Sequence, residues 1–170
     1  ARSLPPDSVV ILGGEHTGVI TLGKRGSWDQ DVKSQNGLPV LVTDRGGQAT
    51  LHSPGQLVIY PIANVRPLGV RNWVRFLLQV SAQTFQAHGI QVDPGDNSGL
   101  FVGGRKLASL GLRIENGVSR HGLALNMKND LSLFQQIRVC GSSDQVMIRA
   151  DEINPKIESQ EFFLDWVQNF

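Results

Sequence analysis

Four segments of this 170-residue chain combine glycine with side chains that can do acid–base or nucleophilic chemistry. The first, residues 44–56, contains Arg45, two adjacent glycines and His52. Adjacent glycines let a ligand approach the backbone closely, and the N–H groups are then available to an anion or a carbonyl. The alternative is a tight connection between two strands. The segment lacks Gly-Lys-Ser/Thr and GxGxxG spacing, which excludes a P-loop and a dinucleotide-binding loop.

Lysine and histidine distinguish the next two segments. In residues 103–111, Lys106 opens a strand-like stretch of small residues. Such a lysine is most often a solvated strand end, but next to a thiol it lowers the thiol's pKa from about 8.5 by favouring the thiolate. In residues 120–126, His121 is more often a hydrogen-bonded structural residue than a catalyst. Four scattered histidines without an i, i+4 or HxH pair predict that there is no metal site.

The fourth segment holds the single cysteine of the chain, Cys140. One cysteine excludes an internal disulfide and a cysteine-based zinc site. A lone cysteine is ordinarily buried in an apolar element. Cys140 is instead followed by Gly141 and two serines, whose N–H groups would suit a loop facing a substrate. A structural cysteine and a nucleophile are therefore both open interpretations.

Composition narrows the class of protein. The chain is 40% hydrophobic and 18% charged, within the globular range, and its length suits one domain over residues 1–170. A net charge of +1 argues against a nucleic-acid binder. The chain has no apolar run near the roughly 20 residues of a membrane helix, and its first residues lack a signal-peptide layout. We therefore expect a soluble, cytoplasmic protein without a membrane partner.

Local patterns predict many short strands and two helices. Apolar runs bounded by glycine or proline predict strands, the first two of them buried, at residues 9–12, 19–22, 38–43 and 57–62. Apolar residues at three- and four-residue steps predict a helix over residues 70–88, ended by Gly89. Asn116-Gly117 predicts a hairpin of residues 106–114 and 118–126, and the aromatic C-terminus predicts a second helix. The absence of regular strand–helix alternation indicates an α+β fold with a mixed, largely antiparallel sheet.

Taken in order, these segments resemble the lipoate–protein ligase B family, the octanoyl-[carrier protein]:protein octanoyltransferases. The resemblance covers nearly the whole chain. The motifs that carry it are Glu15-His16-Thr17, residues 21–26, Arg45-Gly46-Gly47-Gln48, His52, Pro54-Gly55-Gln56, residues 106–111, residues 121–126, Asp130-Leu131-Ser132 and Cys140-Gly141. The abrupt start at Ala1 leads us to expect that an early strand or helix of the family is missing.

The resemblance implies the fold of the biotin and lipoate ligase catalytic domain, with helices packed on the sheet around a ligand tunnel. It implies that octanoyl (or lipoyl) passes from acyl carrier protein to a lysine of a lipoyl domain, in 2-oxoacid dehydrogenases or the glycine cleavage H protein. By resemblance Cys140 becomes the acyl-thioester and Lys106 lowers its pKa, while His121 is a possible supporting residue. The matching acyl-binding positions are Arg45, Gly46, Gly47, Gln48, Ala49, Thr50, Leu51, His52, Ser109, Leu110, Gly111, Gly122, Leu123 and Ala124.

The activated acyl group makes a metal or organic cofactor unnecessary, and glycines at residues 46, 47, 111 and 122 are expected to leave a narrow acyl tunnel unobstructed. The chain departs from the family pattern at Ser53, at Val139 and over residues 142–151. Two alternatives therefore stay open. One is an ATP-dependent lipoate or biotin ligase on the same fold, and the other is a non-catalytic acyl-binding relative.

Overall fold

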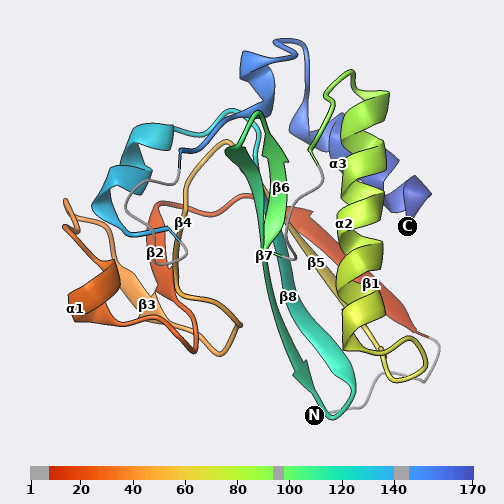
Figure 1. Ribbon diagram of the computed structural model, residues 1–170, viewed down its shortest axis with the longest axis horizontal. Coiled ribbons are helices and arrows are strands. Elements are labelled where there is room, and N and C mark those ends of the chain that lie inside the picture. The colour runs from red at the N-terminus through yellow and green to blue at the C-terminus, as the bar shows by residue number, and fades with distance from the viewer. Residues whose placement is uncertain (1–7, 94–97, 140–145) are drawn as a thin grey trace.

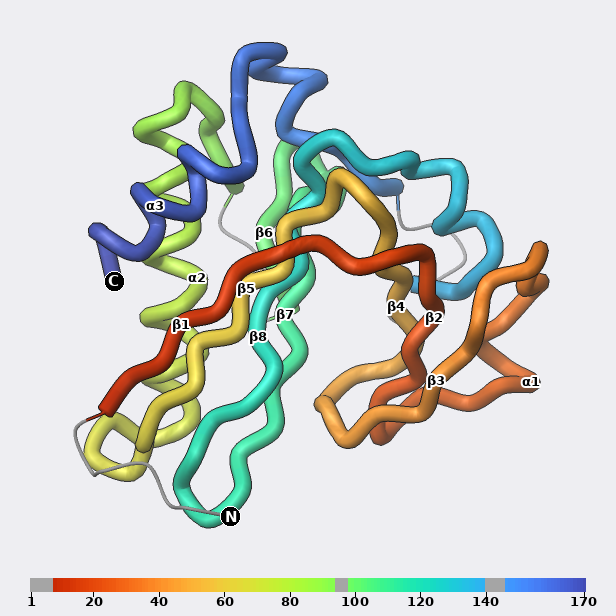
Figure 2. The backbone as a smooth tube through the Cα atoms, turned by 180° about the vertical axis from the view of Figure 1, so that it is seen from behind, coloured from red at the N-terminus to blue at the C-terminus, as the bar shows by residue number. Residues whose placement is uncertain are grey.

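Two β-sheets lie next to each other in this protein (Figures 1 and 2). The computed structural model describes residues 8–93, 98–139 and 146–170. The larger sheet has the strand order β1-β5-β8-β7-β6, and every neighbouring pair in it is antiparallel. Its strands are β1 (Val9–Gly14), β5 (Gln56–Ala63), β6 (Gly99–Val102), β7 (Arg105–Glu115) and β8 (Val118–Asn126).

The smaller sheet has the order β3-β2-β4. Its strands are β2 (Val19–Leu22), β3 (Val40–Val42) and β4 (Ala49–His52), and β2 pairs in parallel with β3 and antiparallel with β4. The predicted α+β class with mixed, largely antiparallel pairing is confirmed. The strands are divided between two sheets, however, and this division creates an inner space that one continuous sheet would lack.

Helices α2 (Val70–Ala87) and α3 (Ser159–Asn169) cover one face of the larger sheet. Leu77 of α2 and Trp166 of α3 are completely buried in the same cluster as Ile59 and Leu123 of the sheet. One face of the smaller sheet packs on the 3-10 helix η1 (Leu131–Gln136). The remaining helices are α1 (Trp28–Asp31) and η2 (Ala150–Glu152). In the described ranges, no helix is long and apolar enough to cross a membrane.

The turn residues behave as their chemistry predicts. Asn116 and Gly117 both adopt positive φ, 53° and 82°, which is the backbone of a type I′ hairpin turn. Gly89 has φ 75° and ends α2, where Ile90 N donates to Phe85 O at 2.9 Å and satisfies a terminal carbonyl. The hairpin and the long helix predicted from the sequence are therefore confirmed.

Two strand predictions need correction. The first strand, β1, was expected to be buried, but it lies at the edge of the larger sheet and its Val9, Val10 and Leu12 are exposed. An apolar run does not reveal whether a strand has neighbours on both sides. Strands β4 and β6 were not predicted, because each is only four residues long and lies in a glycine-rich segment.

Candidate active site

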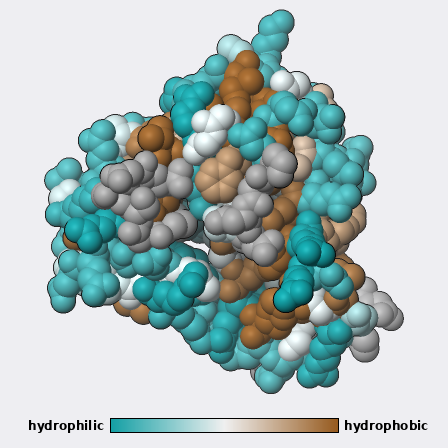
Figure 3. Space-filling view, viewed as in Figure 1, coloured by the Kyte–Doolittle hydropathy of each residue, from teal (hydrophilic) through white to brown (hydrophobic). Residues whose placement is uncertain are grey.

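A pocket of about 910 Å³ lies against both sheets. This volume is within the range of roughly 300–1,000 Å³ usual for small-molecule sites. Thr21 of β2 and Thr50 of β4 line it from the smaller sheet, and Val58 of β5 and Ala124 of β8 from the larger one. Val70 and Val74 of α2 complete an apolar wall. Hydrophobic side chains also gather at the lower centre of the face in Figure 3, where the β7–β8 hairpin meets α2.

The structure brings together nearly all of the acyl-binding positions predicted from the sequence. Every one of them except Leu51 lines this pocket, and so does His121. Leu51 is fully buried in the second core with Ile20, its cross-strand partner. Side chains alternate along a strand, so Thr50 and His52 face the pocket while Leu51 faces the opposite side.

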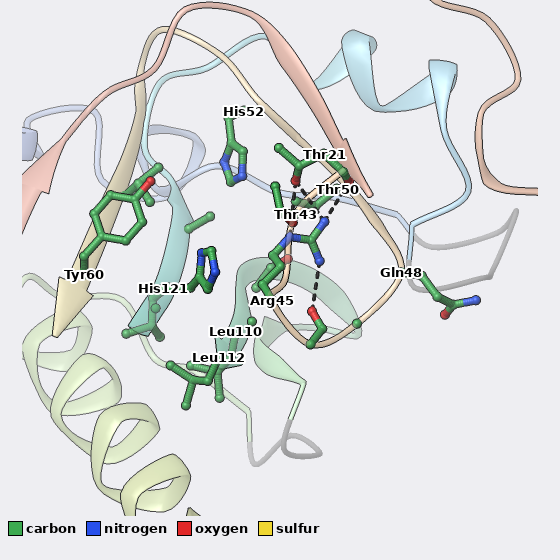
Figure 4. A pocket seen from close by; sticks show the side chains of 18 of the residues that line it. Thr21, Thr43, Arg45, Gln48, Thr50, His52, Tyr60, Leu110, Leu112 and His121 are labelled. Carbon is green, nitrogen blue, oxygen red and sulfur yellow. Dashed lines mark hydrogen bonds between the residues drawn. The ribbon is translucent and has the colours of Figure 1, made fainter. Parts of the chain in front are cut away.

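Arg45 holds the glycine loop in place. Its guanidinium is buried and donates to Thr21 O at 2.7 Å, to Thr21 Oγ1 at 2.9 Å and to Gly46 O at 3.0 Å (Figure 4). Gly46 N in turn donates to Leu112 O at 2.8 Å, which joins the loop to the edge of β7. The loop therefore makes a tight connection between the two sheets across the pocket, and ligand binding by the same residues stays a prediction.

His121 forms a second link between the sheets. Its backbone has φ 61°, an uncommon conformation for a residue with a side chain, and its Nε2 lies 2.6 Å from Asp44 Oδ1. This hydrogen bond, together with the charges of His121 and Arg120, holds the pKa of Asp44 below its usual value. The pair fixes the residue before Arg45 to strand β8.

A polar cluster occupies another wall of the pocket. His52 Nδ1 lies 2.7 Å from Gln56 Oε1, and His16 Nε2 lies 2.5 Å from the Tyr60 hydroxyl. Burial lowers the pKa of His52 to about 4, and the positive charges of His16 and Arg45 act in the same direction. Burial raises the pKa of Tyr60. At neutral pH His52 and Tyr60 are therefore uncharged hydrogen-bonding groups on this wall (Figure 4).

Lys106 lies behind the pocket wall. Only 1% of its surface is exposed, and its Nζ donates to Ser98 Oγ at 3.1 Å and lies 5.2 Å from the centre of the Phe101 ring. Ser98 lines the pocket, whereas Lys106 does not. The lysine predicted to be catalytic is therefore one hydrogen bond away from the pocket.

Cys140 lies outside the described residues, so its place beside Lys106 stays a prediction. The chain that follows residues 140–145 does reach this lysine. Lys106 N donates to Val146 O at 2.8 Å, and Ile148 N donates to Lys106 O at 3.0 Å. A residue six positions after Cys140 is thus paired with the backbone of Lys106.

Comparisons with known proteins agree with this architecture. Residues 2–170 match the family described as the lipoyl protein ligase A/B catalytic domain. The chain belongs to the lipoyl protein ligase A/B family. It is 45% identical to an octanoyltransferase of Chromohalobacter salexigens over 147 residues, which cover 85% of this chain and 66% of that protein. It is 42% identical to an octanoyltransferase of Klebsiella pneumoniae over 146 residues, which cover 84% of this chain and 68% of that protein.

Solved structures extend the comparison to the fold. Lipoate-protein ligase A bound with ATP matches with a TM-score of 0.83 and 14% identity, covering 96% of this chain and 72% of that chain. At this identity the likeness shows the fold alone. The resemblance to the octanoyltransferases and the lipoate-ligase fold inferred from the motifs are confirmed. The chain spans about two thirds of the length of the two octanoyltransferases.

Two glycines that line the pocket differ in how much room the structure leaves for a side chain. A Cβ at Gly122 would lie 1.9 Å from Ile59 O, so the close approach of β5 and β8 requires glycine there. A Cβ at Gly111 would lie 3.2 Å from Arg45 Cδ, within reach of adjustment by that side chain. Gly122 therefore serves strand packing first, although the sequence suggested only an open tunnel.

Several residues that line the pocket were not predicted from the sequence. Some had no chemical signal at all, because apolar and hydroxyl side chains are common on any strand. The missed residues are Val19, Leu41, Thr43, Val58, Tyr60, Val70, Val74, Ser98, Leu112 and Ile114, together with His16, Thr21 and Arg25, which were noted only as parts of motifs. Ser53 and Val139, where the chain departs from the family pattern, are buried and do not line the pocket.

Because the pKa of His52 is lowered, we expect the free energy of unfolding to fall as the pH becomes acidic. The folded state keeps the ring neutral down to about pH 4, whereas the unfolded state protonates below about 6.5. The unfolded state therefore binds more protons in this window, and stability falls as pH falls. Between pH 7 and pH 5 we expect His52 to account for a loss of about 2 kcal/mol. His52→Gln should lose that much less than the wild type in urea unfolding at the two pH values. Equal losses in both proteins would contradict this assignment.

Proposed function

We propose that this protein is an acyltransferase that moves octanoyl from acyl carrier protein to a lysine of a lipoyl domain. The observation that carries the proposal is that one pocket is lined by all but one of the expected acyl-binding residues, with Lys106 directly behind it. The relatives at 42–45% identity are named octanoyltransferases. The pocket suits an acyl chain because its walls combine Val58, Leu110 and Ala124 with glycine.

The proposed chemistry proceeds in two halves through Cys140. Its thiolate attacks the thioester carbonyl of the carrier-bound octanoyl group, and the carrier thiol leaves, so that one thioester replaces another. The amine of the acceptor lysine then attacks the enzyme thioester and forms an amide, which is the more stable linkage. The Lys106 ammonium would favour the Cys140 thiolate at the start of the cycle. Backbone N–H groups of the glycine loops would stabilise the oxyanion in each half.

The proposed partners are acidic proteins, which must dock at a nearly neutral surface. The donor is octanoyl-acyl carrier protein, and the acceptors are lipoyl domains of 2-oxoacid dehydrogenases and the glycine cleavage H protein. Arg71 and Arg75 are exposed on α2, each next to a valine that lines the pocket. Arg25 itself lines the pocket. These cations would attract an acidic carrier to the pocket, and such partners imply a reaction in the cytoplasm.

Intact mass spectrometry tests the proposal. After incubation with octanoyl-carrier protein and no ATP, we expect the mass to rise by one octanoyl group, and hydroxylamine should remove the adduct as it does a thioester. Cys140→Ala should show no adduct. Addition of a lipoyl domain should discharge the wild-type adduct and label the acceptor. An adduct that persists in Cys140→Ala, or labelling that requires ATP, would contradict the proposal and favour the ligase alternative.

A further inference from the structure

Ser98 occupies the boundary between Lys106 and the pocket. Its Oγ accepts a hydrogen bond from Lys106 Nζ at 3.1 Å, and its side chain lines the pocket. Lys106 has almost no exposed surface and does not line the pocket. A proton that moves between the lysine and a molecule in the pocket therefore has a hydroxyl group in its path.

The backbone around Ser98 is held firmly in register. Leu110 N donates to Ser98 O at 2.9 Å, and Gly99 begins β6, which lies beside β7 (Figure 1). A Cβ on Gly99 would lie 1.9 Å from Ala108 O and 3.0 Å from Lys106 Cε. Glycine at this position thus lets β6 approach β7 and leaves room for the lysine stem. The result is a serine fixed at the end of that stem.

The ammonium group of Lys106 also lies over an aromatic ring. The Nζ of Lys106 lies 5.2 Å from the centre of the Phe101 ring, within the range of a cation–π contact. An aromatic ring can attract an ammonium group but cannot accept a proton from it. A hydroxyl group can both accept and donate, so Ser98 differs from Phe101 in being able to exchange protons with Nζ.

We infer that Ser98 relays protons between Lys106 Nζ and a molecule in the pocket. The inference rests on the proposed octanoyl transfer. In the first half, the C–S bond of the carrier thioester breaks, and the departing carrier thiolate takes the Ser98 hydroxyl proton while Lys106 replaces that proton from its ammonium. The carrier leaves as a thiol, and the lysine is left neutral.

The second half restores the starting charges. The acceptor amine forms a C–N bond to the carbonyl of the enzyme thioester, and its surplus proton passes to Ser98 Oγ as the serine proton passes to Lys106 Nζ. The C–S bond breaks with its electron pair on Cys140 Sγ, and the lysine is again an ammonium. Over the cycle one proton moves from the acceptor amine to the carrier thiol, and no other reactant is required.

Steady-state and half-reaction kinetics of Ser98→Ala and Ser98→Thr test the relay. We expect Ser98→Ala to lower kcat at least about tenfold, below the roughly 100-fold usual for loss of a whole acid–base group. The KM for octanoyl-carrier protein should stay within about twofold, since the pocket walls remain. Ser98→Thr keeps the hydroxyl and should recover kcat to within about threefold of the wild type. Ser34→Ala, at an exposed serine before β3, is the matched control.

Alkylation of Cys140 by iodoacetamide separates the relay from general damage to the site. This reaction uses the thiolate but needs no proton transfer through Ser98, so its pH profile should be the same in Ser98→Ala and the wild type. A Ser98→Ala kcat equal to that of the wild type overturns the relay alone, provided that the wild type forms the octanoyl adduct. A threonine variant as slow as alanine, or a shifted alkylation profile, also overturns it. A wild type without an adduct overturns the proposed function as well.

Discussion

We expect Lys106→Met to lower octanoyl transfer at least about 100-fold, the loss typical of a missing acid–base group. Methionine is unbranched and of similar length, so it can fill the buried space of a side chain that is 1% exposed. It keeps the packing and removes the ammonium that donates to Ser98 Oγ. The measurements are the transfer rate to a lipoyl domain and the pH profile of Cys140 alkylation, which should move to higher pH.

Two further variants sharpen this result. Lys106→Arg keeps a positive charge but cannot exchange a proton near neutral pH, so it should not restore the full rate. Lys24→Met removes an exposed lysine and should change neither the alkylation profile nor the half-reaction rate at saturating carrier protein. An unchanged alkylation profile in Lys106→Met would show that the lysine does not act on the cysteine.

We expect Gly122→Ala to destabilise the folded protein by at least about 3 kcal/mol, at the upper end of the cost of overpacking. The added Cβ would lie 1.9 Å from Ile59 O and 2.7 Å from Pro61 Cδ. A backbone oxygen cannot rotate away as a side chain can, so β5 and β8 must separate. Urea unfolding at neutral pH measures the change in the free energy of unfolding.

Gly111→Ala is the matched comparison, since Gly111 lies directly opposite Gly122 in the β7–β8 pair. Its Cβ would meet Arg45 Cδ at 3.2 Å, and a flexible side chain can shift. We expect a loss below about 1.5 kcal/mol, together with weaker use of long acyl chains because the added group enters the pocket wall. Equal destabilisation by the two substitutions would contradict the expectation that a Cβ is tolerated at Gly111 but not at Gly122.

Much of the fold could be predicted from short-range patterns. The stripe of α2, the Asn116-Gly117 turn and the stop at Gly89 each depend on a few neighbouring residues, and each is present in the structure. The exposure of β1 could not be predicted in this way. Burial of a strand depends on which strands pair with it, and within the described part of the chain β1 pairs only with β5.

The candidate site shows the same division. The motif order pointed to about half of the residues that line the pocket, including Arg45, His52 and Ala124. It also included Leu51, because a run of matched residues carries no information about which side of β4 each one faces. Alternation across the sheet separates Leu51 from its two neighbours.

The sequence by itself determined which candidate groups the chain carries, namely one cysteine, a lysine among small residues and paired glycines. Only the tertiary structure decided how the lysine and the glycines lie relative to the pocket. Ser98 and Lys106 are eight positions apart, yet strand pairing places Oγ and Nζ 3.1 Å apart at the pocket wall. Arg45 and Thr21, 24 positions apart, meet in the same way. Hydrogen bonding across strands and the exclusion of side chains from close backbone contacts set these distances, and neither can be derived from residue types along the chain.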